Sequence, residues 1–453
     1  MNRQSLSPVM SELSTYIAQA PRKALPAAVL EKTKHHILDT IAAMLSGSRL
    51  LPGRKAISFV KSLGGAKEAC VAGSRLVTNA VNAALANGMC AHADETDDSH
   101  AASLTHPGCG VVPAALAMAE REGRGGAAFL RAVALGYDVG CRLTLSLDPY
   151  RFREAGHSTH SFGPTFGAAA ACAALAALKA PQVRHVLSYA AQQTSGISCW
   201  MRDPEHVEKA FDFGGMPARN GVTAAAMAAH GLSGVEDVFS GERSFFVAYP
   251  GDPQALIRGL GETFEIMNAS IKRWSVGSPI QAPLDSLVEL MEQHRFDLKD
   301  VKSVVIRVAH QGANTVDNRD MPDICMQHMC AVMLLDGTVG FKSSHDEKRM
   351  RDPRVLAVRQ KVQLSGDDAM SAAMPSRQGI VELELADGRR LRHHTRAVRG
   401  TPDNPMTRAE VDAKSYDLMA PVIGRIRARK LCDALWSLDR IDDVRSLRPL
   451  LRV

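Results

Sequence analysis

The sequence has few aromatic residues, no Cys-x-x-Cys pair and no long apolar run. Aromatic residues make up 5% of the 453 residues. The longest uninterrupted apolar stretch, residues 168–178, is too short to span a bilayer, which takes about 20 residues. Residues 1–14 lack the basic flank, apolar stretch and cleavage site of a secretory signal. We therefore expect a protein with no membrane partner.

The nine cysteines are scattered and include no Cys-x-x-Cys pair, which favours free thiols in a reducing cytoplasm and makes a zinc ribbon or an iron–sulfur cluster unlikely. No glycine-rich turn joins a strand to a helix, so a nucleotide-binding fold has no support. We expect neither a cofactor nor a bound metal. The net charge of +6 is mild, and basic residues are not interleaved with aromatics. That balance argues against nucleic acid and suits a small anionic substrate.

Apolar periodicity predicts helices over most of residues 25–259. Residues 26–46 carry apolar side chains at four-residue steps, and Pro26 suits a first helical turn. Further helices are expected at 79–93, 110–122, 127–142, 164–178 and 182–193. Many are rich in Ala and Gly, which permits close helix–helix approach.

The period changes after about residue 265. Residues 301–310, 361–364 and 381–385 read as strands, and Asp387-Gly388 as a hairpin turn leading to a return strand at 390–396. Helices are expected at 323–335 and from 408 onward. We predict a mainly α protein with a large all-helical domain (1–265), a smaller inserted α+β lid domain (266–400), and a segment (401–453) that returns to the helical domain.

The densest polar cluster, residues 92–108, contains His92, Asp94, Asp97, Asp98 and His106. Lone buried charges are costly, so these groups are solvated, paired or functional. An exposed acidic loop is one interpretation. A second is a metal site of the isoprenoid-synthase type, whose second acidic motif has its only candidate, residues 317–320, in the α+β domain.

The second candidate is the small-polar segment 156–163, which precedes an Ala-rich helix and resembles an anion site at a helix N-terminus. His157 would be placed for proton transfer there. Alternatively, His157 and His160 are capping or surface histidines. Lys209 and Lys272 are candidate carboxylate ligands. The alternative is that each is a solvated side chain, which is the more common role of a lysine.

Together these segments resemble the MmgE/PrpD family, in matching order across nearly the whole chain. The motifs that carry the resemblance are Leu38-Asp39-Thr40, Asn87-Gly88, Asp97-Asp98-Ser99, His106-Pro107-Gly108, Gly156-His157-Ser158-Thr159, Lys209 before Gly214, Lys272-x-Trp274, Leu334-Leu335-Asp336-Gly337 and Gly400-x-Pro402-x-Asn404-Pro405.

The resemblance implies a homodimer whose subunits have a large helical domain and a smaller α+β lid. It also implies an activity such as 2-methylcitrate dehydration, cis-aconitate decarboxylation or iminodisuccinate epimerisation, without an iron–sulfur cluster. By the same resemblance, His106 and His157 would be the acid/base pair, and Lys209 and Lys272 would bind carboxylates and stabilise developing charge. Asp97 and Ser99 would line the pocket.

Three positions depart from the family pattern. His328 stands where a tyrosine usually faces the site, and Gln281 stands where relatives often carry a histidine. The segment after His157 has an extra residue near His160. Because histidine titrates near 6.5 and tyrosine near 10, the change at His328 can alter the proton moved or the substrate accepted. We therefore assign His328 and Gln281 to the substrate pocket.

The sequence thus predicts a cytoplasmic, cofactor-independent hydro-lyase of the 2-methylcitrate dehydratase type that acts on a small di- or tricarboxylate. A decarboxylase or an epimerase on the same scaffold is the first alternative. A carboxylate-binding protein without catalysis is a more distant one.

Overall fold

The computed structural model describes residues 6–453 and divides into two compact units. The first contains the residues up to 93, residues 97–269 and residues 408–453. The second contains residues 94–96 and 270–407. The boundaries predicted from the sequence stand at residues 265 and 400.

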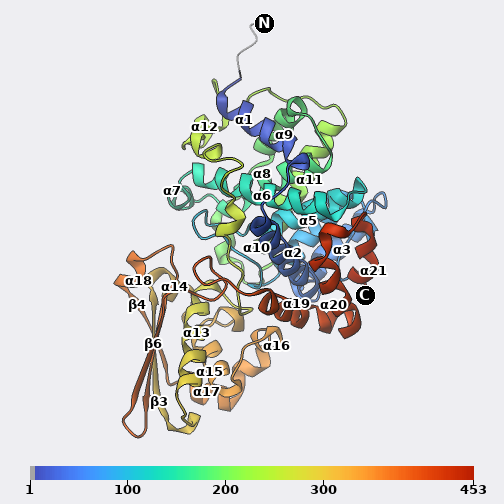
Figure 1. The fold of residues 1–453 in the computed structure, drawn as a ribbon. Coiled ribbons are helices and arrows are strands. Elements are labelled where there is room, and N and C mark those ends of the chain that lie inside the picture. Colours follow the sequence, from blue (N-terminus) through green and yellow to red (C-terminus); the bar gives the residue numbers. More distant parts are fainter. Residues whose placement is uncertain (1–5) are drawn as a thin grey trace. The chain divides into compact units, whose positions relative to one another are not determined.

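The first unit is mainly helical and has five helices packed on one another at its centre. It is not all-helical as predicted, because β1 (Ala69–Cys70) and β2 (Val77–Thr78) form a two-stranded antiparallel sheet in it. The five helices are α4 (Ala80–Ala91), α5 (Pro107–Arg121), α6 (Gly126–Ser146), α8 (Thr159–Leu175) and α11 (Met216–Ala229). Around them lie α1 (Pro8–Gln19), α2 (Ala27–Gly47), α3 (Leu51–Leu63), α7 (Pro149–Glu154) and α9 (Ala180–Gln193). The chain end returns to this unit, since α19 (Arg408–Ile423) packs on α2 and is followed by α20 (Arg425–Trp436) (Figure 1).

Glycines set the spacing between α6 and α8. A Cβ on Gly167 would lie 2.3 Å from the carbonyl oxygen of Gly136, and one on Gly163 would lie 2.5 Å from that of Gly140. Both distances are below any tolerable contact, so the two backbones touch where side chains would otherwise keep them apart. Every residue of α8 is buried as a result. This contact explains why the helical segments are rich in Gly and Ala.

The second unit contains a four-stranded sheet of order β4-β3-β5-β6. Strand β3 (Val301–Ala309) runs parallel to β4 (Val362–Asp367) and antiparallel to β5 (Gly379–Leu385), which pairs with β6 (Arg390–Thr395). Helices α13 (Ser278–Gln293), α15 (Met326–Asp336) and α17 (Pro353–Arg359) cover one face (Figure 1). Alternating residues of β3, namely Val304, Ile306 and Val308, enter the core beneath these helices.

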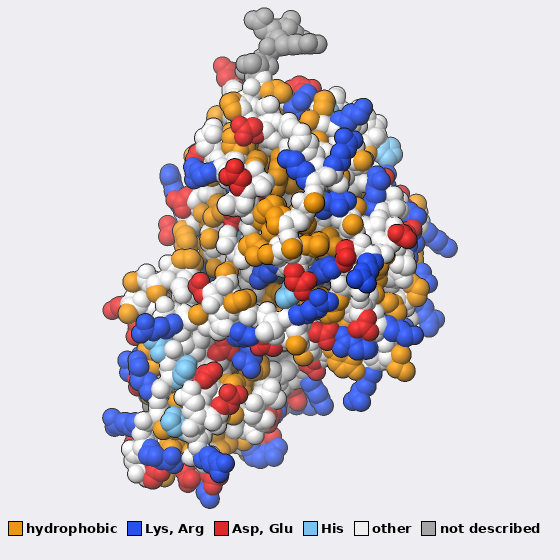
Figure 2. All heavy atoms as spheres, in the orientation of Figure 1, with side chains coloured by type: hydrophobic (Ala, Val, Ile, Leu, Met, Phe, Trp, Pro, Cys, Tyr) orange, Lys and Arg blue, Asp and Glu red, His pale blue; other side chains and the backbone are white. Residues whose placement is uncertain are grey.

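The protein is mainly α, as predicted, and the strands expected from the alternating pattern are present. No helix within residues 6–453 is long and apolar enough to cross a membrane. On the face drawn in Figure 2, Lys and Arg side chains are interspersed with Asp and Glu side chains, as the mild net charge leads one to expect.

We expect Gly167→Ala to destabilise the helical unit by about 1–3 kcal/mol, because the new methyl group forces α6 and α8 apart. Calorimetric thermal unfolding measures the change. Gly277→Ala is the control, because a Cβ there meets its nearest neighbour, Ile324, at an ordinary 3.5 Å. An unfolding midpoint for Gly167→Ala equal to that of the control would contradict the backbone contact.

Candidate acid–base site

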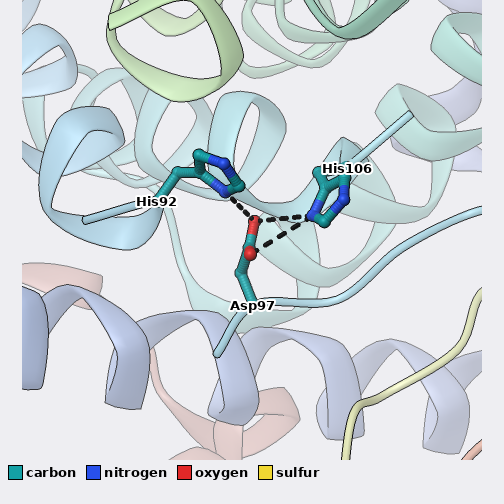
Figure 3. A group of neighbouring side chains, drawn as sticks. All are labelled: His92, Asp97 and His106. Atoms are coloured by element: carbon teal, nitrogen blue, oxygen red, sulfur yellow. Dashed lines mark hydrogen bonds and ion pairs between the residues drawn. The ribbon is translucent and has the colours of Figure 1, made fainter. Parts of the chain in front are cut away.

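The centre of the site is the carboxylate of Asp97, which lies between two imidazoles (Figure 3). His92 directly follows α4 as its C-cap residue, and its Nδ1 lies 2.9 Å from Asp97 Oδ2. His106 directly precedes α5, and its Nδ1 lies 3.2 Å from both carboxylate oxygens. The carboxylate therefore orients both rings and directs Nε2 of each away from itself.

Asp97 is fully buried, and its charge depends on these two rings. Burial by itself raises the pKa of a carboxyl group. Here the adjacent imidazoles of His92 and His106 outweigh burial and hold the pKa of Asp97 well below its usual range. Asp97 is thus ionised at neutral pH and compensates the positive charge that either ring acquires on taking a proton.

The next residue, Asp98, anchors the start of α5. Its Oδ1 accepts the backbone N–H of Gly108 at 3.0 Å, and its Oδ2 accepts the Tyr137 hydroxyl at 2.5 Å and lies 2.6 Å from His36 Nδ1. Burial lowers the pKa of His36 to about 4 against the opposing effect of Asp98, so the ring is neutral and donates its Nδ1–H. Sequence reasoning missed His36 and Tyr137, which lie far from Asp98 in the chain.

A π-helical turn, η3 (Phe211–Gly215), brings the ring of Phe213 between two histidines. It interrupts a run of helix formed by α10 (Val207–Ala210) and α11. His160 stacks on Phe213 with 3.7 Å between ring centroids, and His92 stacks on it at 4.2 Å. At these distances the two histidines occupy opposite faces. Single π-turns of this kind are frequent at functional sites.

Two histidines lie near His106, namely His92, with 5.1 Å between ring centroids, and His160, with 5.4 Å. The predicted partner, His157, instead stacks on Phe152 at 4.5 Å and lies against Tyr249. The geometry thus brings His160, rather than His157, near His106. The reason is the start of α8, which begins at Thr159 and not at Pro164, so His160 occupies its first turn.

Pro164 misled the sequence-based boundary. Proline is favoured at a first helical position because its missing N–H costs nothing there. Here it lies inside the helix, where it cannot donate to the carbonyl of His160, four residues earlier.

His160 is an uncharged imidazole. Burial is the main cause that lowers its pKa well below the usual range, and the nearby His106, His92 and Lys209 act in the same direction. Its Nδ1 is buried without a hydrogen-bond partner within the part of the chain described. A neutral ring with an unpaired nitrogen can exchange a hydrogen bond with a bound substrate.

Lys209 supplies a cation next to these rings. Its Nζ lies 5.2 Å from the centroid of Phe213 and 5.6 Å from that of Trp200. The carboxylate of Asp203 accepts the backbone N–H of Lys209 at 3.0 Å, which fixes the start of α10.

Ser99 is the other predicted pocket residue of this unit. It is half-buried and follows Asp98 directly in the chain.

The acidic cluster does not form one metal-binding face. Asp94 accepts the backbone N–H and the hydroxyl of Thr96 at 2.9 and 2.8 Å, while Asp98 is engaged by His36, Tyr137 and Gly108. Residues 94–98 also form no helix, so the helical face on which the isoprenoid-synthase interpretation depends is not formed. His92, Asp97 and His106 are metal-ligand types with ligand atoms within 4.8 Å, but both Nδ1 atoms already face the carboxylate.

Three predicted site residues lie in the second unit. Lys272 is buried, and its Nζ donates to the carbonyl oxygen of Glu95 at 2.8 Å and lies 3.4 Å from the carboxylate. Gln281 donates to the carbonyls of Trp274 and Val276 and accepts the N–H of Trp274. Its amide thus holds the Trp274–Val276 segment in place.

His328, on α15, is fully buried, and neither ring nitrogen has a hydrogen-bond partner among the described residues. Burial lowers the pKa of His328 to about 4, and the charges of Arg359 and Arg349 act in the same direction. The ring is therefore neutral and keeps unused polar capacity, unlike a histidine that merely fills a core.

His345 and Asp94 form an ion pair at 3.1 Å. We expect the second unit to lose the stability that this pair contributes when the pH is raised. Burial opposes a charge on His345, but Asp94 outweighs it and raises the pKa of His345 to about 9. Because this folded-state pKa lies above the unfolded value near 6.5, the contribution is complete below pH 6.5 and is lost as pH rises through 9. Its size is at most about 3 kcal/mol.

Urea unfolding of wild type and His345→Asn between pH 6 and 10 measures this difference. The two proteins should converge above pH 9. His310→Asn is the control, because it removes a solvent-exposed histidine ion pair, with Asp368, from the same unit. A stability difference for His345→Asn that is constant with pH would rule out the linkage.

The helical unit, the α+β unit and the histidine–aspartate centre together define the class of protein. Residues 11–257 match the MmgE/PrpD N-terminal domain and residues 274–439 match the MmgE/PrpD C-terminal domain, so the chain belongs to the MmgE/PrpD family. The resemblance noted from the motifs is confirmed.

Among known proteins, the chain is similar to three cis-aconitate decarboxylases or relatives of them. It is 26% identical to a cis-aconitate decarboxylase-like protein of Aspergillus oryzae over 65% of this chain and 64% of that protein. It is 23% identical to cis-aconitate decarboxylase of Aspergillus terreus over 98% of this chain and 96% of that one. The human cis-aconitate decarboxylase is 23% identical over 94% of this chain and 90% of its own length.

Proposed function

We propose that this protein is a lyase that moves a proton at a carbon next to a carboxylate of a small di- or tricarboxylate, without a cofactor. The observation that carries the proposal is a pair of histidines whose ring centroids lie 5.4 Å apart. One is His106, which the ionised Asp97 orients, and the other is the neutral His160. Two imidazoles in different electrostatic surroundings provide both an acid and a base.

Decarboxylation of cis-aconitate is the first reaction to test, because the similar curated proteins carry that name. Loss of carbon dioxide leaves an electron pair on carbon, which one protonated imidazole quenches. His106 is suited to this role, since Asp97 compensates its charge before the proton is transferred.

Dehydration of the 2-methylcitrate type is the second candidate, and the unequal histidines favour it. Elimination needs a base for the proton next to the carboxylate and an acid for the departing hydroxyl. His160, being neutral, would take the proton, and His106 would protonate the hydroxyl. Epimerisation would use the same proton abstraction with return of the proton to the opposite face.

Cations complete the proposal, because a carboxylate substrate needs charge compensation as negative charge develops. Lys209 is the cation of the helical unit, and Lys272, from the second unit, is a further proposed carboxylate ligand. Asp97 and Ser99 stay proposed pocket residues. His328 is proposed to contact substrate through its unpaired ring nitrogens, and Gln281 to support the Lys272 segment. A cytoplasmic homodimer, as the resemblance implies, is part of this proposal.

We expect His106→Asn and His160→Asn each to lower turnover about 10²- to 10⁴-fold, the usual contribution of a general acid or base. His157→Asn is the matched control and should retain near wild-type turnover. An NMR time course in D₂O follows purified, EDTA-treated protein with cis-aconitate, 2-methylcitrate, citrate and iminodisuccinate. Carbon dioxide release, olefin formation and deuterium exchange without elimination distinguish decarboxylase, dehydratase and epimerase.

The variants also separate the two histidine assignments. Loss of turnover in His157→Asn with retention in His160→Asn would restore the pair inferred from the sequence and overturn the one proposed here. No change in any of the four substrates would contradict the lyase proposal and leave carboxylate binding, measured by calorimetry, as the alternative.

Replacing the ammonium of Lys209 by an uncharged side chain of similar length, in Lys209→Met, should raise KM about 10- to 100-fold. A hydrogen bond from a charged donor contributes about 1.5–3 kcal/mol, which corresponds to that range. Lys179→Met, at an exposed lysine of the same unit, is the control for loss of a positive charge. Equal kinetics for Lys209→Met and the control would exclude Lys209 as a carboxylate ligand.

A further inference from the structure

Asp212 is a buried carboxylate next to the site that the proposed chemistry does not use. It lies in the π-helical turn η3, one residue before Phe213. Its Oδ2 accepts the hydroxyl of Ser158 at 2.5 Å. Ser158 is the N-cap residue of α8, two residues before His160. The hydrogen bond therefore joins the turn that carries Phe213 to the turn that carries His160.

A third segment closes around this hydrogen bond. The carbonyl of Gly196 accepts the backbone N–H of Ser158 at 3.1 Å, and the carbonyl of Ser195 accepts the hydroxyl of Ser161 at 2.5 Å. Gly196 has φ of +125°, a conformation that favours glycine. A Cβ there would lie 2.0 Å from Ser161 Oγ and 2.7 Å from Asp212 Oδ1. The backbone of Gly196 thus lies so close to the carboxylate of Asp212 that no side chain fits between them.

The two turns are consequently linked twice. One link is the hydrogen bond between Asp212 and Ser158, and the other is the stack of Phe213 on His160, with 3.7 Å between centroids and 10° between planes. Stacked rings can shift parallel to one another with little loss of interaction free energy. A short hydrogen bond to a carboxylate, in contrast, is directional. The hydrogen bond is therefore the link that decides where the His160 ring lies relative to His106.

We propose that Asp212 is a positioning residue for His160, which it holds in register with Phe213 and His106 through its hydrogen bond with Ser158. The catalytic consequence of this role rests on the proposed function, whereas the positioning itself does not. Asp212 touches no reacting atom in this scheme and acts through the first turn of α8.

The charge state of Asp212 changes the strength of this link. Burial raises the pKa of Asp212 to about 7, the hydrogen bond from Ser158 opposes that rise, and the charge of Glu208 adds to it. The groups that face it are thus Glu208 from α10, Ser158 and Ser161 from α8 and, from the 3₁₀ helix Ser198–Arg202, the thiol of Cys199. Above pH 7 the carboxylate accepts the Ser158 hydroxyl as a charge-assisted bond, which is the stronger form.

Kinetics test the catalytic consequence. Asp212→Ala should lower kcat about 10- to 100-fold with KM within about threefold, since a misplaced catalytic group loses turnover more than binding. Asp212→Asn keeps an acceptor for Ser158 and should be intermediate. Ser158→Ala should match Asp212→Ala, and the double variant should be no slower than either, because both remove one interaction.

Asp237→Ala is the matched control. Asp237 also accepts a serine hydroxyl, from Ser240 at 2.8 Å, and belongs to the same unit. It should lose stability without a change in kcat. A fall in kcat for Asp212→Ala no larger than for Asp237→Ala, or additive losses in the Asp212/Ser158 double variant, would overturn the proposal.

A substrate-free measurement separates this proposal from the proposed function. The indole of Trp200 lies edge-on to Phe213 at 4.7 Å and to His160 at 5.5 Å, so its fluorescence reports on the ring cluster. The signal is assigned by difference against Trp200→Phe. We expect a transition with a midpoint near pH 7 in the wild type that is absent in Asp212→Asn.

The two results together are decisive. The transition without activity on any carboxylate would support the positioning role and refute the proposed function. Activity with a transition that persists unchanged in Asp212→Asn would refute the positioning role and leave the proposed function standing.

Discussion

The buried negative charge of Asp97 is the constraint on which the arrangement of the helical unit depends. A carboxylate without solvent is stable only with compensating partners, and Asp97 has two imidazoles at 2.9 and 3.2 Å. These come from the end of α4 and the start of α5, so the charge ties the two helices together. Asp98 adds the N–H of Gly108 and the hydroxyl of Tyr137 from α6. One carboxylate thus orients two imidazoles, and its neighbour anchors the start of α5.

The helices can converge on this charge because their contact faces are small. Gly136 and Gly167 let α6 and α8 touch through their backbones, and α8 in turn carries His160 on its first turn. A larger residue at either glycine would move the histidine away from His106. The π-turn at 211–215 has a comparable effect, because its extra residue per turn turns Phe213 into the space between His92 and His160. Packing and chemistry therefore depend on the same few backbone positions.

Much of this protein was predictable from local patterns. Four-residue apolar steps mark α2, alternation marks β3, and Asp387-Gly388 marks the hairpin between β5 and β6, because each depends only on neighbours along the chain. The family follows from motif order, and it is confirmed. The position of His160 near His106 did not follow, because it depends on whether Pro164 begins α8 or lies inside it. Tertiary packing stabilises a helix start that local preference disfavours.

The sequence by itself therefore determined the mainly helical class, the alternation of the inserted sheet and the family. Only the tertiary structure decided which groups meet. His36 and Tyr137 reach Asp98 from distant helices, Phe213 enters through a π-turn, and Asp212 reaches Ser158 across 54 residues. The physical reason is that hydrogen bonding and charge compensation act over a few ångströms in space, whereas a sequence pattern reports only separation along the chain.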